Sequence, residues 1–232
     1  MNVACLRPTR LLLPALLTVL LAPRSWAQEI APTFKIGLST ATLSGTSPFD
    51  FEPYTGFAGG LGFNFALRNG FSIQPEIIYV VKGTRLDFDV RSTFDTILIS
   101  PPGQDPEGVP ATGTLRLTYA EIPLLLHYGF ETRSRLHPRL FAGPALSYLL
   151  DARFAWAPRD GGVEQEQAED NIESTDFGLV LGAGIEYDLY GERLLFEIRL
   201  SRGFSNTNFG NASANDRTLT NTSVMFLVGV AF

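Results

Sequence analysis

The sequence predicts an all-β fold, an eight-stranded antiparallel up-and-down transmembrane β-barrel. Three observations predict it. After residue 30, apolar residues recur at every second position, which is the spacing of strands whose two faces meet different surroundings. Eight segments show this alternation, and the connections between them alternate in length, as they do in outer-membrane barrels with an even strand count.

The first residues have the features of a signal peptide. Two arginines precede the apolar run 11–22, and the small residues Ser25 and Ala27 stand where a cleavage site requires them. The alternative, a transmembrane anchor, needs roughly 20 apolar residues, whereas this run is shorter and is interrupted by a proline. We expect residues 1–27 to be a cleaved signal peptide and residues 28–232 to form the outer-membrane β-barrel domain.

Composition excludes several classes of function. The only cysteine, Cys5, lies in the segment expected to be removed, so the exported chain is expected to have no disulfide and no thiolate metal site. A net charge of -6 argues against nucleic acid as a partner. The acidic loop at 159–173 suggests a calcium site, but its spacing matches no ligand loop and a solvated loop is expected. The sequence predicts no metal and no cofactor.

The first three strands are predicted from alternation alone. In 34–39, Phe, Ile and Leu alternate with Lys, Gly and Ser. In 56–67, five Phe or Leu residues alternate with Gly, Ala and Asn. In 71–82, apolar residues alternate with Ser, Gln, Glu and Lys, except that Ile78 and Val80 fall on the polar side. Each segment therefore has one apolar face and one polar face.

The fourth strand, 115–128, is less regular. Leu115, Leu117 and Tyr119 lie in line with Glu121, so apolar and charged residues share one face. We expect a bulge or an aqueous stretch near the start of this strand.

The last four strands resume the alternation. They are predicted at 139–151, 176–187, 194–201 and 223–232, where Leu, Phe, Ile, Val and Tyr alternate with Gly, Ser and charged residues. A tilted strand needs about 9 to 11 residues to cross a membrane, and each segment can supply them.

The connections indicate which end of the barrel faces outward. Short turns are expected at 68–70, 129–138 and 190–192, and long polar loops near 44–54, 91–113, 158–173 and 205–219. In outer-membrane barrels the short turns and both termini face the periplasm, and the long loops face outward.

A soluble exported barrel of the lipocalin kind would show the same alternation with its apolar side inward. Against it, the polar face is crowded with Gly and Ala, which suits a narrow lumen better than a solvated surface. The apolar face also carries two groups of aromatic residues, as expected at two membrane interfaces. They are Tyr128, Tyr187, Tyr190, Phe71 and Phe232 toward the short turns, and Tyr54, Phe57, Tyr79, Tyr148, Trp156, Phe204 and Phe209 toward the loops.

The polar face collects charges of both signs. They are Lys35, Glu76, Lys82, Glu121, Arg139, Asp176, Glu186, Glu197 and Arg199. Because side chains fill the lumen of an eight-stranded barrel, we expect these residues to form a charge-paired structural plug. A proton relay or an ion path is the functional alternative.

Only two histidines could serve hydrolytic chemistry, as some small barrels of this membrane are lipid-modifying enzymes. His127 is predicted near the periplasmic end of its strand, and His137 in a turn. Neither is expected at the outer leaflet, so no catalytic residue is predicted.

Several segments, taken together and in order, resemble a known family. They are 71–79 (FSIQPEIIY), 119–126 (YAEIPLLL), 142–145 (AGPA) and 176–184 (DFGLVLGAG). The chain resembles the PorT-like family of Bacteroidetes-type outer-membrane β-barrel proteins over nearly its whole length. The resemblance implies an eight-stranded outer-membrane barrel, and the family's namesake takes part in the secretion of surface proteins. Phe232 resembles the terminal aromatic by which the barrel assembly machinery recognises its substrates.

From these observations we expect a non-enzymatic protein of the bacterial outer membrane with a structural or protein-interaction role. The expected partners are outer-membrane lipid, the barrel assembly machinery, and other envelope or secretion proteins. The rival hypotheses are a lipid-modifying barrel enzyme and a narrow channel for small solutes.

Overall fold

The computed structural model describes residues 30–45, 49–92, 97–159, 165–168, 174–204 and 219–232. The predicted signal peptide, most of the acidic loop and the loop 205–218 lie outside these residues. The described strands are β1 (Ile30–Gly45), β2 (Phe51–Ala66), β3 (Phe71–Ser92), β4 (Ile97–Ser100), β5 (Val109–Gly129), β6 (Leu136–Pro158), β7 (Gln165–Ala168), β8 (Thr175–Leu189), β9 (Glu192–Gly203) and β10 (Leu219–Ala231).

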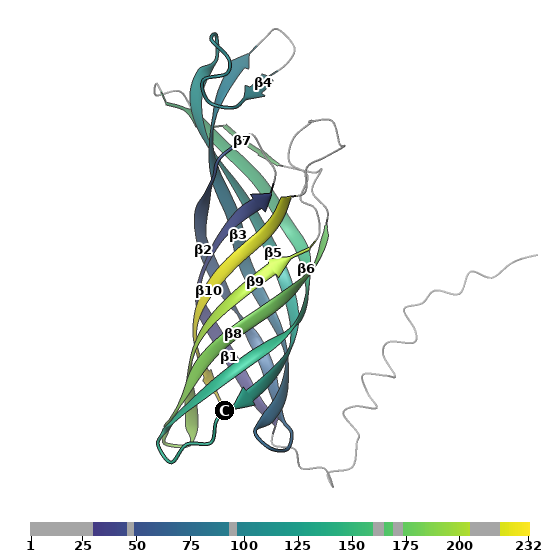
Figure 1. The fold of residues 1–232 in the computed structure, drawn as a ribbon, viewed down its shortest axis with the longest axis vertical. Coiled ribbons are helices and arrows are strands. Elements are labelled where there is room, and N and C mark those ends of the chain that lie inside the picture. The colour runs from purple at the N-terminus through teal and green to yellow at the C-terminus, as the bar shows by residue number, and fades with distance from the viewer. Residues whose placement is uncertain (1–29, 46–48, 93–96, 160–164, 169–173, 205–218) are drawn as a thin grey trace, which may run out of the picture.

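Eight of these strands form a closed ring. Each long strand pairs antiparallel with the next along the chain, and β1 pairs with β10 to close the barrel (Figure 1). The short strands β4 and β7 add to β3 and β6 outside the ring. The predicted eight-stranded up-and-down barrel is confirmed. No helix among the described residues is long and apolar enough to cross a membrane.

The short connections are tight turns at one end of the barrel. Asn69 and Gly70 have φ angles of 59° and 77°, and Tyr190 and Gly191 have 49° and 107°, so each pair occupies the left-handed region that sharp hairpin turns require. The C-terminus lies at the same end (Figure 1), as predicted.

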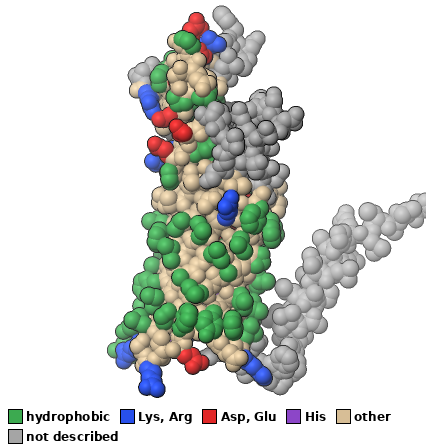
Figure 2. Space-filling model, viewed as in Figure 1, with side chains coloured by type: hydrophobic (Ala, Val, Ile, Leu, Met, Phe, Trp, Pro, Cys, Tyr) green, Lys and Arg blue, Asp and Glu red, His purple; other side chains and the backbone are tan. Residues whose placement is uncertain are grey.

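The outward face of the ring is apolar. Leu61 is 58% exposed and Ile77 is 62% exposed, whereas the adjacent Ile78 is 1% exposed because it points inward. Figure 2 shows apolar side chains as a band across the visible face of the barrel, with charged side chains beyond it at both ends. A water-soluble barrel would bury this band, so its exposure excludes the lipocalin-like alternative.

Aromatic side chains gather toward both edges of the band. Near the short turns the rings of Phe71 and Tyr128 lie 4.9 Å apart, and toward the loops those of Phe57 and Tyr79 lie 6.4 Å apart. Trp156 is predicted in the group toward the loops but is half-buried against the apolar core, because β6 has an extra residue at Leu150 and Trp156 therefore lies on the inward face with Ala152 and Phe154. Phe209 lies outside the described residues.

Three neighbouring strands are longer than a membrane requires. β3, β5 and β6 have 22, 21 and 23 residues, against 12 in β9. A spanning strand needs only about 9 to 11 residues. Their outer parts therefore rise above the rest of the rim, as Figure 1 shows, and carry β4 and β7. We call residues 84–92, 97–116, 152–159 and 165–168 the extension.

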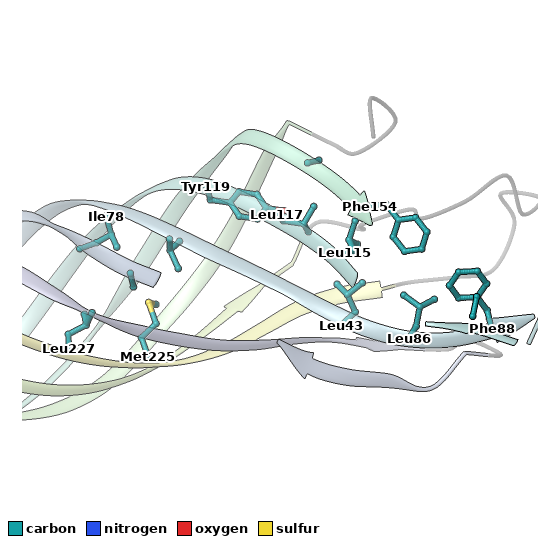
Figure 3. Packing of buried hydrophobic residues seen from close by; sticks show 14 of the residues in the cluster. Leu43, Ile78, Leu86, Phe88, Leu115, Leu117, Tyr119, Phe154, Met225 and Leu227 are labelled. Carbon is teal, nitrogen blue, oxygen red and sulfur yellow. The ribbon is translucent and has the colours of Figure 1, made fainter. Parts of the chain in front are cut away.

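The interior of the outer half is apolar, not aqueous. A cluster of buried side chains runs from mid-barrel into the extension (Figure 3). Its larger members are Leu43, Ile78, Val80, Leu86, Phe88, Leu115, Leu117, Tyr119, Phe154, Met225 and Leu227. The aqueous stretch predicted near Leu115, as the alternative to a bulge, is therefore wrong, because Leu115 and Leu117 on the inward face of β5 are buried in this cluster.

The predicted bulge lies beside β5 and not within it. Thr118 pairs with Asp151 and Tyr119 with Leu149, so the extra residue is Leu150 on β6. Leu150 and Asp151 both face outward, and beyond them the inward positions of β6 shift by one residue.

Candidate functional site

Four charged side chains meet at the centre of the barrel. Lys35 Nζ lies 2.7 Å from Glu76 Oε1 and 2.7 Å from Glu197 Oε1. Arg199 Nη1 lies 2.6 Å from Glu76 Oε2, and its Nε donates to Glu197 Oε2 at 3.0 Å. All four residues are buried. We call these residues the central cluster; its two cations and two carboxylates balance.

Glycines on neighbouring strands leave room for the central cluster. A Cβ at Gly62 would lie 2.9 Å from Glu76 Cγ, and one at Gly229 would lie 2.8 Å from Lys35 Cγ. A larger residue at either position would displace a charged side chain. The packing of the central cluster therefore explains why the polar face has glycine at these two positions.

A second group lies nearer the short turns. Arg139 on β6 pairs with Glu186 on β8, and Arg193 on β9 reaches the other oxygen of Glu186 at 2.9 Å. Arg139 Nη2 also contacts His127 Nδ1 at 2.5 Å. Gln74 joins this group to the central cluster, because its Nε2 donates to Glu76 at 2.6 Å while its Oε1 faces Arg139 at 3.4 Å.

A third pair is separate from these groups. Lys82 Nζ lies 2.7 Å from Glu121 Oε2, with Ser147 Oγ at 3.4 Å from the same oxygen. The ammonium also lies 5.7 Å from the centre of the Tyr119 ring. This pair is enclosed by the apolar cluster.

The predicted charges thus fall into three groups, with one exception. Asp176 lies apart, near the loop end of β8, where its Oδ1 accepts a hydrogen bond from the backbone N–H of Phe204 at 3.2 Å. The sequence groups Asp176 with the interior charges because alternation shows which face of the strand a residue is on. It does not show how far along the barrel axis the residue lies.

The charge-paired plug predicted from the sequence did not include several residues of the interior network. Gln74 and Arg193 take part in the polar network, and Phe141 packs between Arg199, 5.2 Å from its ring centre, and His127, stacked at 4.7 Å. The alternation does place Arg193 on the inward face, because it stands four residues before Glu197 in the same strand. Nothing in the sequence marks Phe141, since it sits in a run of apolar residues.

His137 lies in a triad-like arrangement at the start of β6, beside the short connection from β5. Its Nε2 is 2.9 Å from Asp188 Oδ2, and its Nδ1 is 3.3 Å from Thr132 Oγ1. The Thr132 hydroxyl, however, donates to the backbone carbonyl of Leu136 at 2.5 Å. Its proton is therefore committed to the turn and not to the imidazole, which gives this group the geometry of a turn-stabilising contact.

The part of the chain that the structure describes contains no group of three or more His, Cys, Asp or Glu residues placed to hold a metal ion. The calcium alternative concerned the acidic loop, most of which lies outside that part.

Comparisons with known proteins agree with this architecture. The family model of the outer membrane protein beta-barrel domain matches residues 26–208. No curated protein matches the chain.

Among solved structures, the chain is similar to three outer-membrane proteins. Neisserial surface protein A is 16% identical, with 88% of this chain and 97% of that chain covered and a TM-score of 0.42. OprG from Pseudomonas aeruginosa is 14% identical, with 88% and 97% covered and a TM-score of 0.42. Outer membrane protein W from Escherichia coli is 12% identical, with 89% and 100% covered and a TM-score of 0.42. Because the family model covers well over half of its length, the chain belongs to the family of outer membrane protein beta-barrel domains and is a protein of the bacterial outer membrane.

Proposed function

We propose that this protein is a non-enzymatic outer-membrane barrel that presents its extension to other proteins at the cell surface. The extension is the observation that carries the proposal. It lies beyond the apolar band, and the apolar cluster of the barrel continues into it, where the ring centre of Phe88 lies 6.0 Å from that of Phe154 and 6.2 Å from that of Trp156. A folded platform on a rigid scaffold suits specific binding better than transport.

The filled interior argues against the channel alternative. The central cluster fills the lumen at mid-height with ion pairs, and the apolar cluster fills the outer half. An eight-stranded ring encloses little more space than its own side chains need. We propose that the interior charges have a structural role and hold the wall of the barrel around a closed centre.

The enzyme alternative has one candidate constellation among the described residues, Thr132, His137 and Asp188. It lies at the short-turn end, away from the outer leaflet, and its hydroxyl donates to a backbone carbonyl. An activated nucleophile instead donates its proton to the imidazole.

The proposal includes the route to the membrane. Residues 1–27 would direct export, and Phe232, which is 63% exposed at the end of the last strand, would present a terminal aromatic side chain to the barrel assembly machinery. The resemblance to PorT-like proteins supports a partner from a secretion system for surface proteins.

Site-specific photocrosslinking in intact cells tests this proposal. A photoreactive amino acid at Val109 or Ile99, both exposed on the extension, should give reproducible adducts with one or a few envelope proteins. The same amino acid at Leu61, in the apolar band, is the matched control and should give none. Adducts that are absent from the extension, or equally frequent at Leu61, would contradict an interaction role.

Planar-bilayer recording separates the proposal from the channel alternative. The native protein should give no discrete conductance steps, because ion pairs occupy the mid-height lumen. Steady conductance that changes in Glu76→Gln would favour the channel.

A further inference from the structure

The barrel opens toward the short turns in a vestibule made of two connected cavities. The outer cavity has a volume of about 430 Å³, and the inner one has about 220 Å³. Both are lined by Gly129, His137, Glu186 and Arg193, so the inner cavity continues the outer one into the barrel. His127 and Arg139 line only the inner cavity.

His127, which lines the inner cavity, carries a buried donor without an acceptor. His127 is 1% exposed, and its Nε2 has no hydrogen-bond partner among the described residues. An arginine can only donate, so the contact from Arg139 makes His127 Nδ1 an acceptor. The proton of the neutral ring then lies on Nε2, which becomes an N–H group that lacks an acceptor. A buried donor without a partner is destabilising, so it indicates a missing acceptor.

The charges around this donor do not balance. The polar network of the central cluster and vestibule contains four cations, Lys35, Arg139, Arg193 and Arg199, and three carboxylates, Glu76, Glu186 and Glu197. Within the central cluster the charges cancel, so the surplus cation is at the inner cavity, where Arg139 and Arg193 share the single carboxylate Glu186.

The other charged groups of the vestibule line the outer cavity. Asp188 lines the outer cavity but is bound to His137 at 2.9 Å, and Glu131 lines the outer cavity only. Phe232 also lines the outer cavity and not the inner one. The inner cavity therefore combines a net positive charge with an unfilled N–H donor.

We propose that the inner cavity is a binding site for a small oxyanion, phosphate or carboxylate, delivered from the periplasmic side. Its oxygen accepts from His127 Nε2, and its charge is balanced by Arg193, whose side chain is 39% exposed and reachable from the vestibule. Charge-assisted hydrogen bonds from arginine are the strongest that a protein offers such a group. The site is at the opposite end of the barrel from the extension, so it stands or falls independently of the proposed function.

Calorimetry on the folded barrel tests the site. The protein is prepared in a phosphate-free, non-ionic detergent and titrated in separate runs with sodium phosphate and sodium acetate, which distinguishes the two anion classes. Saturable binding of at least one is expected. In ¹H–¹⁵N spectra the imidazole Nε2–H signal of His127, assigned by its loss in His127→Gln, should shift during the same titration.

Two vestibule variants and one control sharpen the result. Arg193→Gln should weaken the Kd at least tenfold, and Glu186→Gln should tighten it several-fold, because it releases two guanidinium groups. Arg202→Gln removes an exposed arginine of the same strand outside the vestibule and should leave the Kd unchanged. The site is refuted if neither anion binds saturably, if Arg193→Gln and Arg202→Gln behave alike, or if the His127 signal does not move.

Discussion

Single residues show how costly the interior of this barrel is to disturb. The central cluster has no net charge only while all four side chains are present. Each of its two carboxylates contacts both cations. Removing one partner from a buried ion pair leaves an uncompensated charge in a region of low dielectric constant, which destabilises a fold by about 3–5 kcal/mol.

Arg199→Met should therefore lower the free energy of unfolding by about 3–5 kcal/mol. Denaturant unfolding of the refolded protein in detergent, followed by tryptophan fluorescence, measures the change. Arg202→Met is the control, since an exposed substitution is usually within about 0.5 kcal/mol of neutral. Equal stability of the two variants would show that the cluster contributes nothing to the fold.

The sequence located most of the interior charges but not their partners. The alternation identified Lys35, Glu76 and Arg199 as residues that face the interior, because every second side chain of a strand points to the same face. It could not show that Phe141 packs beside Arg199, or that His127 accepts from Arg139, because those contacts depend on strand register around a closed ring.

At the scale of the strands, the pairing of β5 with β6 is interrupted beside Pro123. It passes from Pro123 and Ala145 directly to Leu126 and Ala142, since proline has no N–H to donate. Gly143 lies in this gap, and a Cβ there would be 1.9 Å from the carbonyl oxygen of Leu124.

Gly143→Ala should therefore force the two backbones apart and destabilise the barrel by about 1–3 kcal/mol, in the range of other overpacked sites. The folded fraction is read from heat-modifiable migration on gels. Gly129→Ala is matched, because its Cβ would meet only the oxygen of Gly70 at 3.8 Å. Normal folding of Gly143→Ala would show that the strands can separate without cost.

The extension is held across three strands by a polar contact on its surface. Asp87 on β3 pairs with Arg159 and accepts from Thr112 on β5 at 2.9 Å. The hydrogen bond from Arg159 holds the pKa of Asp87 below its ordinary value. Because the folded pKa is the lower one, the contact contributes fully above the unfolded value of about 3.9 and is lost as pH falls through the folded pKa.

Protection of residues 84–92 against hydrogen exchange, corrected for intrinsic rates, should therefore decrease as pH falls below about 4. The effect is small, at most about 1 kcal/mol, because the pair is half-exposed. In Asp87→Asn the protection should be lower at neutral pH and should lose this pH dependence. A wild-type profile that is flat through the same interval would contradict the role of this pair.

Strand number and order were predictable, whereas strand length was not. Turn residues such as Asn69 and Gly70 mark the hairpins at one end. At the other end β3 continues through Leu86 and Phe88, where alternation no longer distinguishes lipid-facing from core-facing residues, so the extension left no boundary in the sequence.

For the whole molecule, the decisive property is an apolar exterior around a filled centre. Ile77 and Ile78 are neighbours in sequence, yet one faces lipid and the other the apolar cluster. The sequence predicted the exterior because its apolar parity is nearly unbroken, but it did not predict the apolar outer half of the interior, since Met225 and Leu227 stand in a uniformly apolar strand.

Ile77→Lys should lower stability in lipid vesicles by about 2–4 kcal/mol, the cost of a cation on the lipid face near mid-membrane. Urea titrations of the protein folded into phosphatidylcholine vesicles give the value. Val109→Lys, on the exposed surface of the extension, is the comparison and should be nearly neutral. Similar values for both would show that Ile77 does not face hydrocarbon.

The unequal strands also fix how far this protein reaches from its anchoring leaflet. β3 exceeds the spanning length by roughly ten residues, which is about 33 Å of strand at 3.3 Å per residue. Only one side of the rim has this height, so any molecule that approaches the barrel from its loop end would first meet the tip of this one-sided projection, above the lipid headgroups.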